Sequence, residues 1–196
     1  MNQMILLLQY LFTLRNYHSV MGVLAGLASS PVSRLKFTQR ELPAKTSKIL
    51  TDIENEMSSA SSFRNYRQQL NKERSACVPF LGVILSDLTF MEDGNPDFTE
   101  AGLINWQKRT LLYTVLSQFL DFQSRSFYNV PDNPLSKSLI GSINALQLTS
   151  DELYATSLKL EPRGGIPPEL VEKPTIGATL KNLKEKATDA IKSVSY

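Results

Sequence analysis

Cysteine and histidine are almost absent from this chain of 196 residues, which has one of each, Cys77 and His18. A single cysteine excludes a disulfide within the chain, and a lone histidine leaves too few ligands for a Cys/His metal site. One thiol is typical of a reducing compartment inside the cell. We expect Cys77 to be a buried structural thiol and His18 a core or surface side chain, because the two alone make a poor nucleophile and base.

Charge of one sign is also scarce, since 21 Lys and Arg residues against 19 Asp and Glu leave a net charge of +2. No basic cluster interleaved with aromatic residues occurs, so nucleic acid is not expected as a partner. The glycine-rich phosphate motifs, the HExxH zinc motif and the GxSxG hydrolase motif are missing. The adjacent acids Glu92 and Asp93 would point about 100° apart on a helix, which does not suit a glycosidase. Covalent and acid–base catalysis are therefore disfavoured, and we expect a binding protein with no metal ion and no cofactor.

The apolar start of the chain, residues 1–12, is too short to cross a bilayer. It lacks the basic region and the cleavage site of a signal peptide, so it is predicted to be a buried helix. Along the rest of the chain, apolar residues recur at steps of three and four, which is the helical pattern. The predicted helices cover residues 2–28 (as one or two helices), 44–58, 63–71, 79–92, 103–122, 135–146 and 150–160.

Several details of these helices can be predicted as well. In residues 2–28 one apolar helical face is expected, made by Leu7, Tyr10, Leu11 and Leu14 and continued by Tyr17, Val20, Met21, Leu24 and Leu27. Ser62 is expected to cap the helix over 63–71, and Pro79 to lie in the first turn of the next. Ser150 is expected to cap the last helix without a capping box. Only residues 80–85 favour a strand, so the predicted fold class is all-α.

The domain organisation follows from the turn residues near the end of the chain. Residues 1–163 are predicted to be one helical domain, and residues 164–196 a Pro/Gly linker with a lysine-rich tail. Within the tail, residues 175–194 carry apolar positions at helical spacing opposite several lysines. This segment is either a solvated tail with nascent helix or a weak membrane-surface or partner helix.

Residues 77–96, CVPFLGVILSDLTFMEDGNP, contain the most informative pattern. Ser86, Thr89 and Asp93 are spaced i, i+3 and i+7, so they lie along one face of an otherwise apolar helix. Exposure to water alone would account for this stripe, but a binding surface is the sharper interpretation.

This stretch resembles the central signature of the catalytic domain of Ras-family guanine-nucleotide exchange factors. Four further stretches resemble the same family in the same order: LRNYHSVMGVLAGLASSPVSRL at residues 14–35, FRNYR at 63–67, GLINWQKR at 102–109 and LYATSLKLEPR at 153–163. Together they cover roughly residues 2–163. The resemblance implies an all-helical domain from which a helical hairpin, residues 79–120, protrudes.

The resemblance also implies a partner, a small GTPase of the Ras, Rap or Ral type, and a mechanism without covalent chemistry. The hairpin would enter the nucleotide site and open the first switch of the GTPase. Thr89 would block the magnesium site, and Asp93 would offer its carboxylate to the hydroxyl and lysine that hold phosphate and Mg²⁺. Ser86 would touch the second switch, and Asn95 would hydrogen-bond at the hairpin tip. Such a factor is expected in the cytoplasm, acting at the inner face of a membrane when bound to its GTPase.

Other residues acquire roles by the same resemblance. Phe63, with Met21 behind it, would form an apolar pocket for a switch-II aromatic side chain, and Ser30 and Arg34 would lie near its rim. Pro79 and Phe80 would support the hairpin without touching the partner. From the residues alone, Phe63 and Met21 are equally well explained as plain core.

The chain departs from the family in several ways. The family domain normally begins with further helices, so the chain is expected to be the C-terminal part, with core surface on residues 1–28 left exposed. Ala28, Ser33 and Leu111 stand where asparagine, tyrosine and lysine are common in the family. These departures leave an alternative open, in which the chain is an exchange-inactive module that binds a GTPase or acts as a scaffold.

Overall fold

The computed structural model describes residues 1–125, 134–146 and 148–164, and over these ranges it confirms the all-α prediction. Isolated β-bridges are the only extended pairing among the described residues. The helices are α1 (Asn2–Thr13), α2 (Tyr17–Ala28), α3 (Ser30–Ser33), α4 (Lys36–Arg40), α5 (Ala44–Glu56), α6 (Ala60–Lys72), α7 (Leu81–Gly94), α8 (Trp106–Ser124), α9 (Pro134–Ala145) and α10 (Ser150–Leu160).

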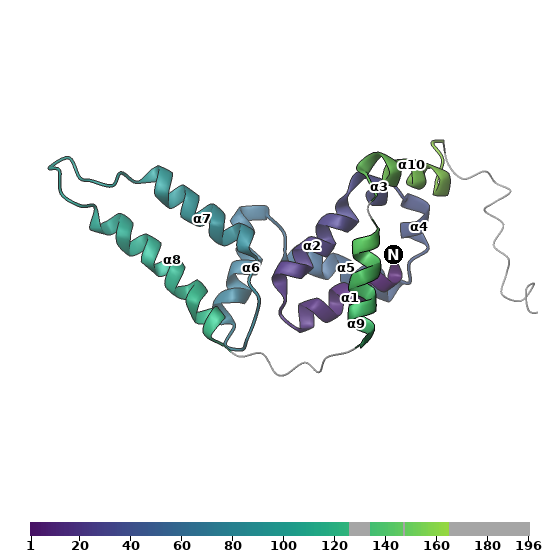
Figure 1. Cartoon of the computed structure of the whole chain (residues 1–196), viewed down its shortest axis with the longest axis horizontal. Helices are drawn as coiled ribbons and strands as arrows, with labels where there is room; N and C mark the ends of the chain where they lie inside the picture. Colours follow the sequence, from purple (N-terminus) through teal and green to yellow (C-terminus); the bar gives the residue numbers. More distant parts are fainter. Residues whose placement is uncertain (126–133, 147, 165–196) are drawn as a thin grey trace, which may run out of the picture.

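The helices form a body from which one pair of helices projects. Helices α7 and α8 lie side by side and extend away from the rest of the molecule, with α6 at their base (Figure 1). At the other end, α1 packs on α2 and α5, and α10 packs on α3. The chain reverses between α7 and α8 at the far end of the pair, so residues 95–105 form its tip.

The core joins the body to the base of the projecting pair. Two buried tyrosines, Tyr17 of α2 and Tyr66 of α6, meet edge to face with ring centroids 5.5 Å apart. The other buried members of this cluster come from α1, α2, α5, α6, α7, α8 and the segment before α7: Leu8, Val20, Ile53, Met57, Leu70, Cys77, Val83 and Phe122. Burial raises the pKa of the Cys77 thiol to about 11, so Cys77 is a buried thiol that stays protonated at neutral pH.

The prediction for residues 2–28 is right in its helices and wrong in part of its face. The helices separate at Arg15, whose φ of 58° is left-handed, and the Asn16 side chain then caps α2 by accepting from the Ser19 amide. In α1 the buried side chains are Ile5 and Leu8, whereas the expected Leu7 and Tyr10, and Leu14 just after the helix, are exposed. Too many positions of α1 are apolar for periodicity alone to identify the buried ones.

Three predicted helix starts also need correction. Helix α7 begins at Leu81, so Pro79 precedes the helix and does not lie in its first turn. Ser62 does not cap α6, because Ser61, Ser62 and Phe63 all adopt left-handed backbone angles. Helix α8 begins at Trp106, three residues later than the predicted start.

The cap of α10 differs from the prediction by one residue. Thr149, not Ser150, accepts from the Glu152 amide, and the Glu152 carboxylate accepts from the Thr149 amide in return. This is a full capping box, where a cap without the box was expected.

The predicted Pro/Gly linker and lysine-rich tail, residues 164–196, begin at the last residue that the structure describes. Residues 165–196, which include the proposed amphipathic segment 175–194, lie outside the described residues. Among the residues that the structure does describe, no helix is long and apolar enough to cross a membrane.

Candidate functional site

The predicted stripe on α7 is open to solvent. Ser86, Thr89 and Asp93 are all exposed, and the helix that carries them projects from the body (Figure 1). The Thr89 hydroxyl donates to the Leu85 carbonyl oxygen at 3.0 Å, so it is occupied within its own helix. Asp93 has no side-chain hydrogen bond or ion pair to any part of the chain that the structure describes. The stripe therefore offers a partner the bulk of a threonine and a free carboxylate.

A shallow hollow lies beside this stripe. It has a volume of about 400 Å³ and is lined by Leu88, Thr89, Glu92 and Asp93 from α7 and by Leu112 from α8. The Asp93 carboxylate thus stands next to apolar side chains from both helices. A cation or hydroxyl of a partner that entered this hollow would find the Asp93 carboxylate in a partly apolar setting.

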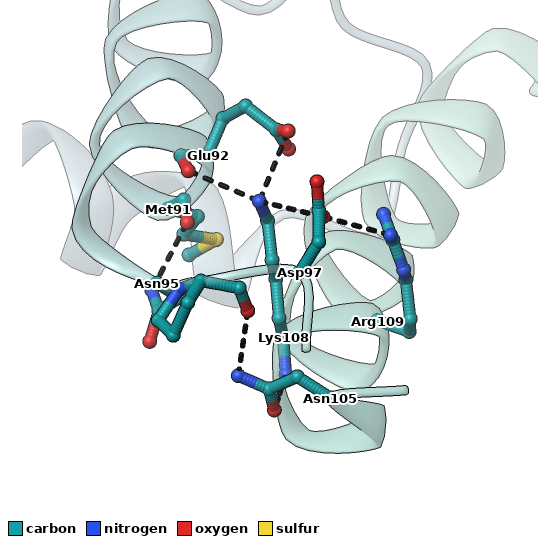
Figure 2. Close-up of polar contacts among 8 residues, drawn as sticks. Met91, Glu92, Asn95, Asp97, Asn105, Lys108 and Arg109 are labelled. Carbon is teal, nitrogen blue, oxygen red and sulfur yellow. Dashed lines mark hydrogen bonds and ion pairs between the residues drawn. The ribbon is translucent and has the colours of Figure 1, made fainter. Parts of the chain in front are cut away.

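The second acid of the pair, Glu92, has a different role, because it belongs to a polar cluster at the tip (Figure 2). Its carboxylate accepts from Nζ of Lys108 at 3.0 Å, and so does its backbone carbonyl at 3.1 Å. Nζ of Lys108 also lies 3.0 Å from Oδ1 of Asp97, which accepts from Arg109 at 2.8 Å. The Lys108 ammonium holds the pKa of the Asp97 carboxyl below its usual range.

Two asparagines brace the backbone around this cluster. Asn95 donates through Nδ2 to the Met91 carbonyl at 3.0 Å, and Asn105 donates to the Pro96 carbonyl at 2.9 Å (Figure 2). Asn105 also caps α8 by accepting from the Lys108 amide. The bond to Met91 uses one of the two N–H donors of the Asn95 amide, so its second N–H and its oxygen are the groups left for the predicted contact with a GTPase.

The sequence interpretation missed Glu92, Asp97, Asn105 and Lys108 as members of the site. One feature of the sequence pointed to an acidic cluster around Lys108. This lysine lies in the first turn of a helix, where the helix dipole disfavours positive charge. Such a lysine is expected to have acidic neighbours, but their positions on α7 and in the tip follow only from the folded chain.

The base of the projecting pair is fixed by contacts with α6. Arg67 forms a two-pronged ion pair with Asp87 of α7, with distances of 2.6 and 2.7 Å. This hydrogen-bonded pair raises the pKa of Arg67. On the other helix, Gln118 donates to Asn71 at 3.1 Å. Both projecting helices are therefore attached to the same element of the body.

Pro79 and Phe80 lie at this base, where support of the hairpin was expected. Pro79 is buried, and the Phe80 amide donates to the Tyr66 hydroxyl at 2.7 Å. The Phe80 ring folds over the first turn of α7, where a Cβ at Gly82 would lie only 2.4 Å from its Cζ atom. A glycine at position 82 thus permits this close approach.

The aromatic part of the predicted binding surface also gathers at the base. The Phe63 ring lies 6.0 Å from the Phe80 ring, which lies 6.2 Å from the His18 ring. Phe63 and Met21 are both half-buried against the main core cluster. Both side chains therefore contribute to the core, and the pocket for a partner's aromatic ring stays a prediction.

The remaining predicted contacts are separated from the stripe along the chain. Ser30 is exposed at the start of α3. Arg34 donates from its two terminal nitrogens to the carbonyls of Ser157 and Glu161, each at 2.7 Å. Its guanidinium therefore caps the C-terminus of α10, and the described geometry gives its predicted GTPase contact no support.

Comparison with known proteins places this arrangement in a family. The RasGEF domain model matches residues 1–110, which include α1 to α7, the tip and the first turn of α8.

Several curated relatives agree. Ras guanine nucleotide exchange factor I of Dictyostelium discoideum is 42% identical over 150 residues, which are 76% of this chain and 18% of the relative. Ras guanine nucleotide exchange factor J of the same organism is 41% identical over 150 residues, with the same two shares. Ras-specific guanine nucleotide-releasing factor 2 of Mus musculus is 34% identical over 151 residues, which are 76% of this chain and 12% of the relative. The chain thus spans less than a fifth of the length of these relatives.

Proposed function

This chain belongs to the RasGEF domain family, and on that premise we propose that it stimulates GDP release from a Ras-like small GTPase. The relatives named above are called Ras guanine nucleotide exchange or releasing factors, which supports a GTPase of this kind as the partner. The experiment below compares Ras-, Rap- and Ral-type GTPases to identify which of them is the partner.

We propose that the exposed face of α7 that carries Ser86, Thr89 and Asp93 performs the exchange step. Thr89 and Asp93 would enter the nucleotide site of the GTPase, where Thr89 occupies the space of Mg²⁺ and its waters. The Asp93 carboxylate would accept from the hydroxyl and the lysine that otherwise hold phosphate and metal. Ser86 would contact the second switch, and Phe63 would contact it at the base of the hairpin.

This is catalysis by differential binding, in which no bond of the exchange factor is made or broken. The chain would bind the nucleotide-free GTPase more tightly than the nucleotide-bound form, and so lower the affinity of the GTPase for nucleotide by the same factor. The observation that carries the proposal is the free, exposed carboxylate of Asp93 in line with Thr89 on a projecting helix.

The test measures release of a fluorescent GDP analogue from Ras-, Rap- and Ral-type GTPases in the presence of the chain. Asp93→Arg replaces the acceptor with a cation, so we expect the accelerated rate to fall by about tenfold or more, a loss of about 1.4 kcal/mol of stabilisation. Asp52→Arg is the matched control, because Asp52 is an exposed aspartate on α5, far along the chain from the stripe. This control should keep the full rate.

Two results would contradict the proposal in different ways. If the unaltered chain accelerates release from none of the three GTPases, exchange activity is refuted. If the chain accelerates release and Asp93→Arg does so equally well, exchange stands, but the role of the α7 face is refuted.

The second candidate is a module that binds a GTPase without exchanging its nucleotide. Leu111 favours it, because this leucine is exposed on α8 at a position where the family resemblance suggests a lysine. Such a module would bind nucleotide-free and GDP-loaded GTPase equally well, since equal affinity cannot shift the nucleotide equilibrium. Titration of both forms by calorimetry separates the candidates.

Two further parts of the proposal concern location. We propose that the chain acts at the inner face of a membrane, because its Ras-like partner would be there. The lysine-rich segment 175–194 would add a weak contact with anionic lipid, and its sequence pattern is the support for this.

A further inference from the structure

We propose that Lys108 is a positioning residue, which holds the end of α7 in the conformation that presents Asp93 to a partner. This inference rests on the proposed function for its consequence in exchange. Its structural part, the anchoring of the tip by Lys108, stands on the geometry of this chain alone.

Burial of the side chain is the first observation. Lys108 has 2% of its side chain exposed, which is rare for a lysine in a helix that projects into solvent. A buried ammonium is destabilising unless its donors are all used. Here the three acceptors are the Glu92 carboxylate, the Glu92 carbonyl and the Asp97 carboxylate, all within 3.1 Å (Figure 2). Lys108 is therefore enclosed by this chain and is not itself a contact for a partner.

The electrostatic setting explains why Lys108 reaches across to α7. The residue lies in the first turn of α8, at the positive end of that helix, where a cation is unfavourable. Its Nζ atom instead lies against the last turn of α7, at the negative end of that helix. Burial lowers the pKa of Lys108, but hydrogen bonds with Glu92 and Asp97 outweigh this and raise it. Lys108 thus stays charged and joins the two helices.

Lys108 acts on Asp93 through the peptide bond that joins Glu92 to Asp93. The carbonyl that Lys108 holds belongs to the peptide bond between Glu92 and Asp93, and this group is planar. Fixing its oxygen therefore limits the rotation of the Asp93 backbone. The same ammonium binds the Glu92 carboxylate and draws it toward the tip, while the Asp93 carboxylate stays without a partner in the described chain. Lys108 thereby assigns different roles to two adjacent acids.

The first experiment uses the chain alone and measures amide hydrogen exchange at residues 92–95 and at Asp97. Lys108→Met keeps much of the side-chain volume and removes the charge. We expect these amides to exchange about tenfold faster, the factor expected when a charged hydrogen bond is lost. Lys48→Met, an exposed lysine of α5, is the matched control and should leave them unchanged. Unchanged exchange at Asp93 in Lys108→Met would overturn the proposal, whether or not the chain acts on any GTPase.

A second variant covers the case in which Lys108→Met does not fold. Asp97→Asn keeps the lysine and weakens one of its ion pairs, so it should loosen the same amides to a smaller extent. The helical circular dichroism signal of each variant shows whether the rest of the fold is intact.

The second experiment tests the consequence for exchange through a double-mutant cycle. Lys108→Met should lower the saturating rate of GDP release by about ten- to a hundredfold, because the acting group is misplaced, with a smaller change in the half-saturating concentration. In an Asp93→Ala background the same substitution should have little further effect. Equal effects of Lys108→Met in both backgrounds would overturn the positioning role. If the unaltered chain releases no GDP, the proposed function fails, and the amide-exchange result still decides the anchoring.

Discussion

Tyr66 shows how one buried polar atom fixes the base of the projecting helices. Its ring is 1% exposed and packs edge to face on Tyr17, while its hydroxyl accepts from the Phe80 amide just before α7 begins. That amide is one of the donors at a helix start for which the helix itself supplies no acceptor. Burial raises the pKa of Tyr66, so its hydroxyl stays protonated at any ordinary pH.

We therefore predict that Tyr66→Phe destabilises the chain although it removes only one oxygen. The ring would still fill its site, but the Phe80 amide would be left buried without a partner, which lowers the free energy of unfolding by about 1–3 kcal/mol. Urea unfolding followed by circular dichroism measures this. Tyr113→Phe is the control, because Tyr113 is 72% exposed, and its effect should be within about 0.5 kcal/mol. Equal stability of the two variants would contradict the role of the Tyr66 hydroxyl.

For single residues, the sequence predicted which side chains of α7 share a face but not which of them are paired. The spacing of Ser86, Thr89 and Asp93 gave one exposed helical face, and the structure places all three there. The same spacing could not say that Glu92 is paired and Asp93 is free. That difference depends on Lys108, which is sixteen residues further along the chain and reaches α7 only after the chain has reversed.

At the scale of elements, α10 is attached to the body by two charged side chains, Arg34 and Glu161. Arg34 binds the last carbonyls of α10, and the Glu161 carboxylate caps the start of α4. Glu161 is 4% exposed and accepts from the Phe37 amide, the Thr38 amide and the Thr38 hydroxyl. Burial raises the pKa of this carboxyl, but the hydrogen bonds and Arg34 outweigh it, so its pKa lies below the ordinary value.

The contacts of the Glu161 carboxylate predict a loss of stability in acid. A carboxyl with a lowered pKa in the folded state adds stability above its unfolded pKa of about 4.3, and this is lost as pH falls through the folded pKa. Protonation of Glu161 should therefore contribute to a fall in Tm between about pH 5 and pH 3. Glu161→Gln should lower the free energy of unfolding at pH 7 by about 1–3 kcal/mol and make the Tm less dependent on pH.

Thermal scans of both chains from pH 7 to pH 3 check this prediction. Other acids, such as Glu73 and Asp97, also have lowered pKa values and are unchanged in the variant, so the difference between the two curves isolates Glu161. Parallel curves would show that Glu161 does not titrate in this range.

Periodicity predicted the longer helices but not the short helices α3 and α4, and it misplaced several helix starts. Helices over α5, α9 and α10 agree with the prediction to within a residue or two, because apolar spacing is a property of the local sequence. The start of α6 does not follow from spacing. Residues 61–63 adopt left-handed backbone angles, and none of them is the glycine that would usually indicate such angles in a sequence. The buried face of α1 was missed because it depends on contacts with α2 and α5, which are made only in the folded chain.

At the scale of the whole molecule, burial is uneven along the long axis. Helices α1, α2, α5 and α6 each bury two side chains within 12 or 13 residues. Among the described residues, α7 buries only Val83 in 14 residues, and α8 buries only Lys108 and Phe122, near the two ends of its 19 residues. Large apolar side chains of α8, such as Trp106, Tyr113 and Leu120, are more than half exposed. The projecting pair is therefore held at its base by α6 and at its tip by the Lys108 cluster, with less support between them.

This distribution predicts that local stability falls from the body to the projecting pair, and that a bound partner protects α7. Opening free energies from native-state amide exchange should be lower for residues 110–116 in α8 than for residues 19–24 in α2, because fewer buried contacts must break. Adding a nucleotide-free Ras-like GTPase should slow exchange in residues 86–93 of α7 while leaving α5 unchanged, since the proposed contact covers one side of the projecting pair. Asp93→Arg should keep the gradient of the free chain and lose the protection by the GTPase. Equal opening free energies in α2 and α8 would contradict the gradient, and protection of α5 without α7 would move the binding surface to the body.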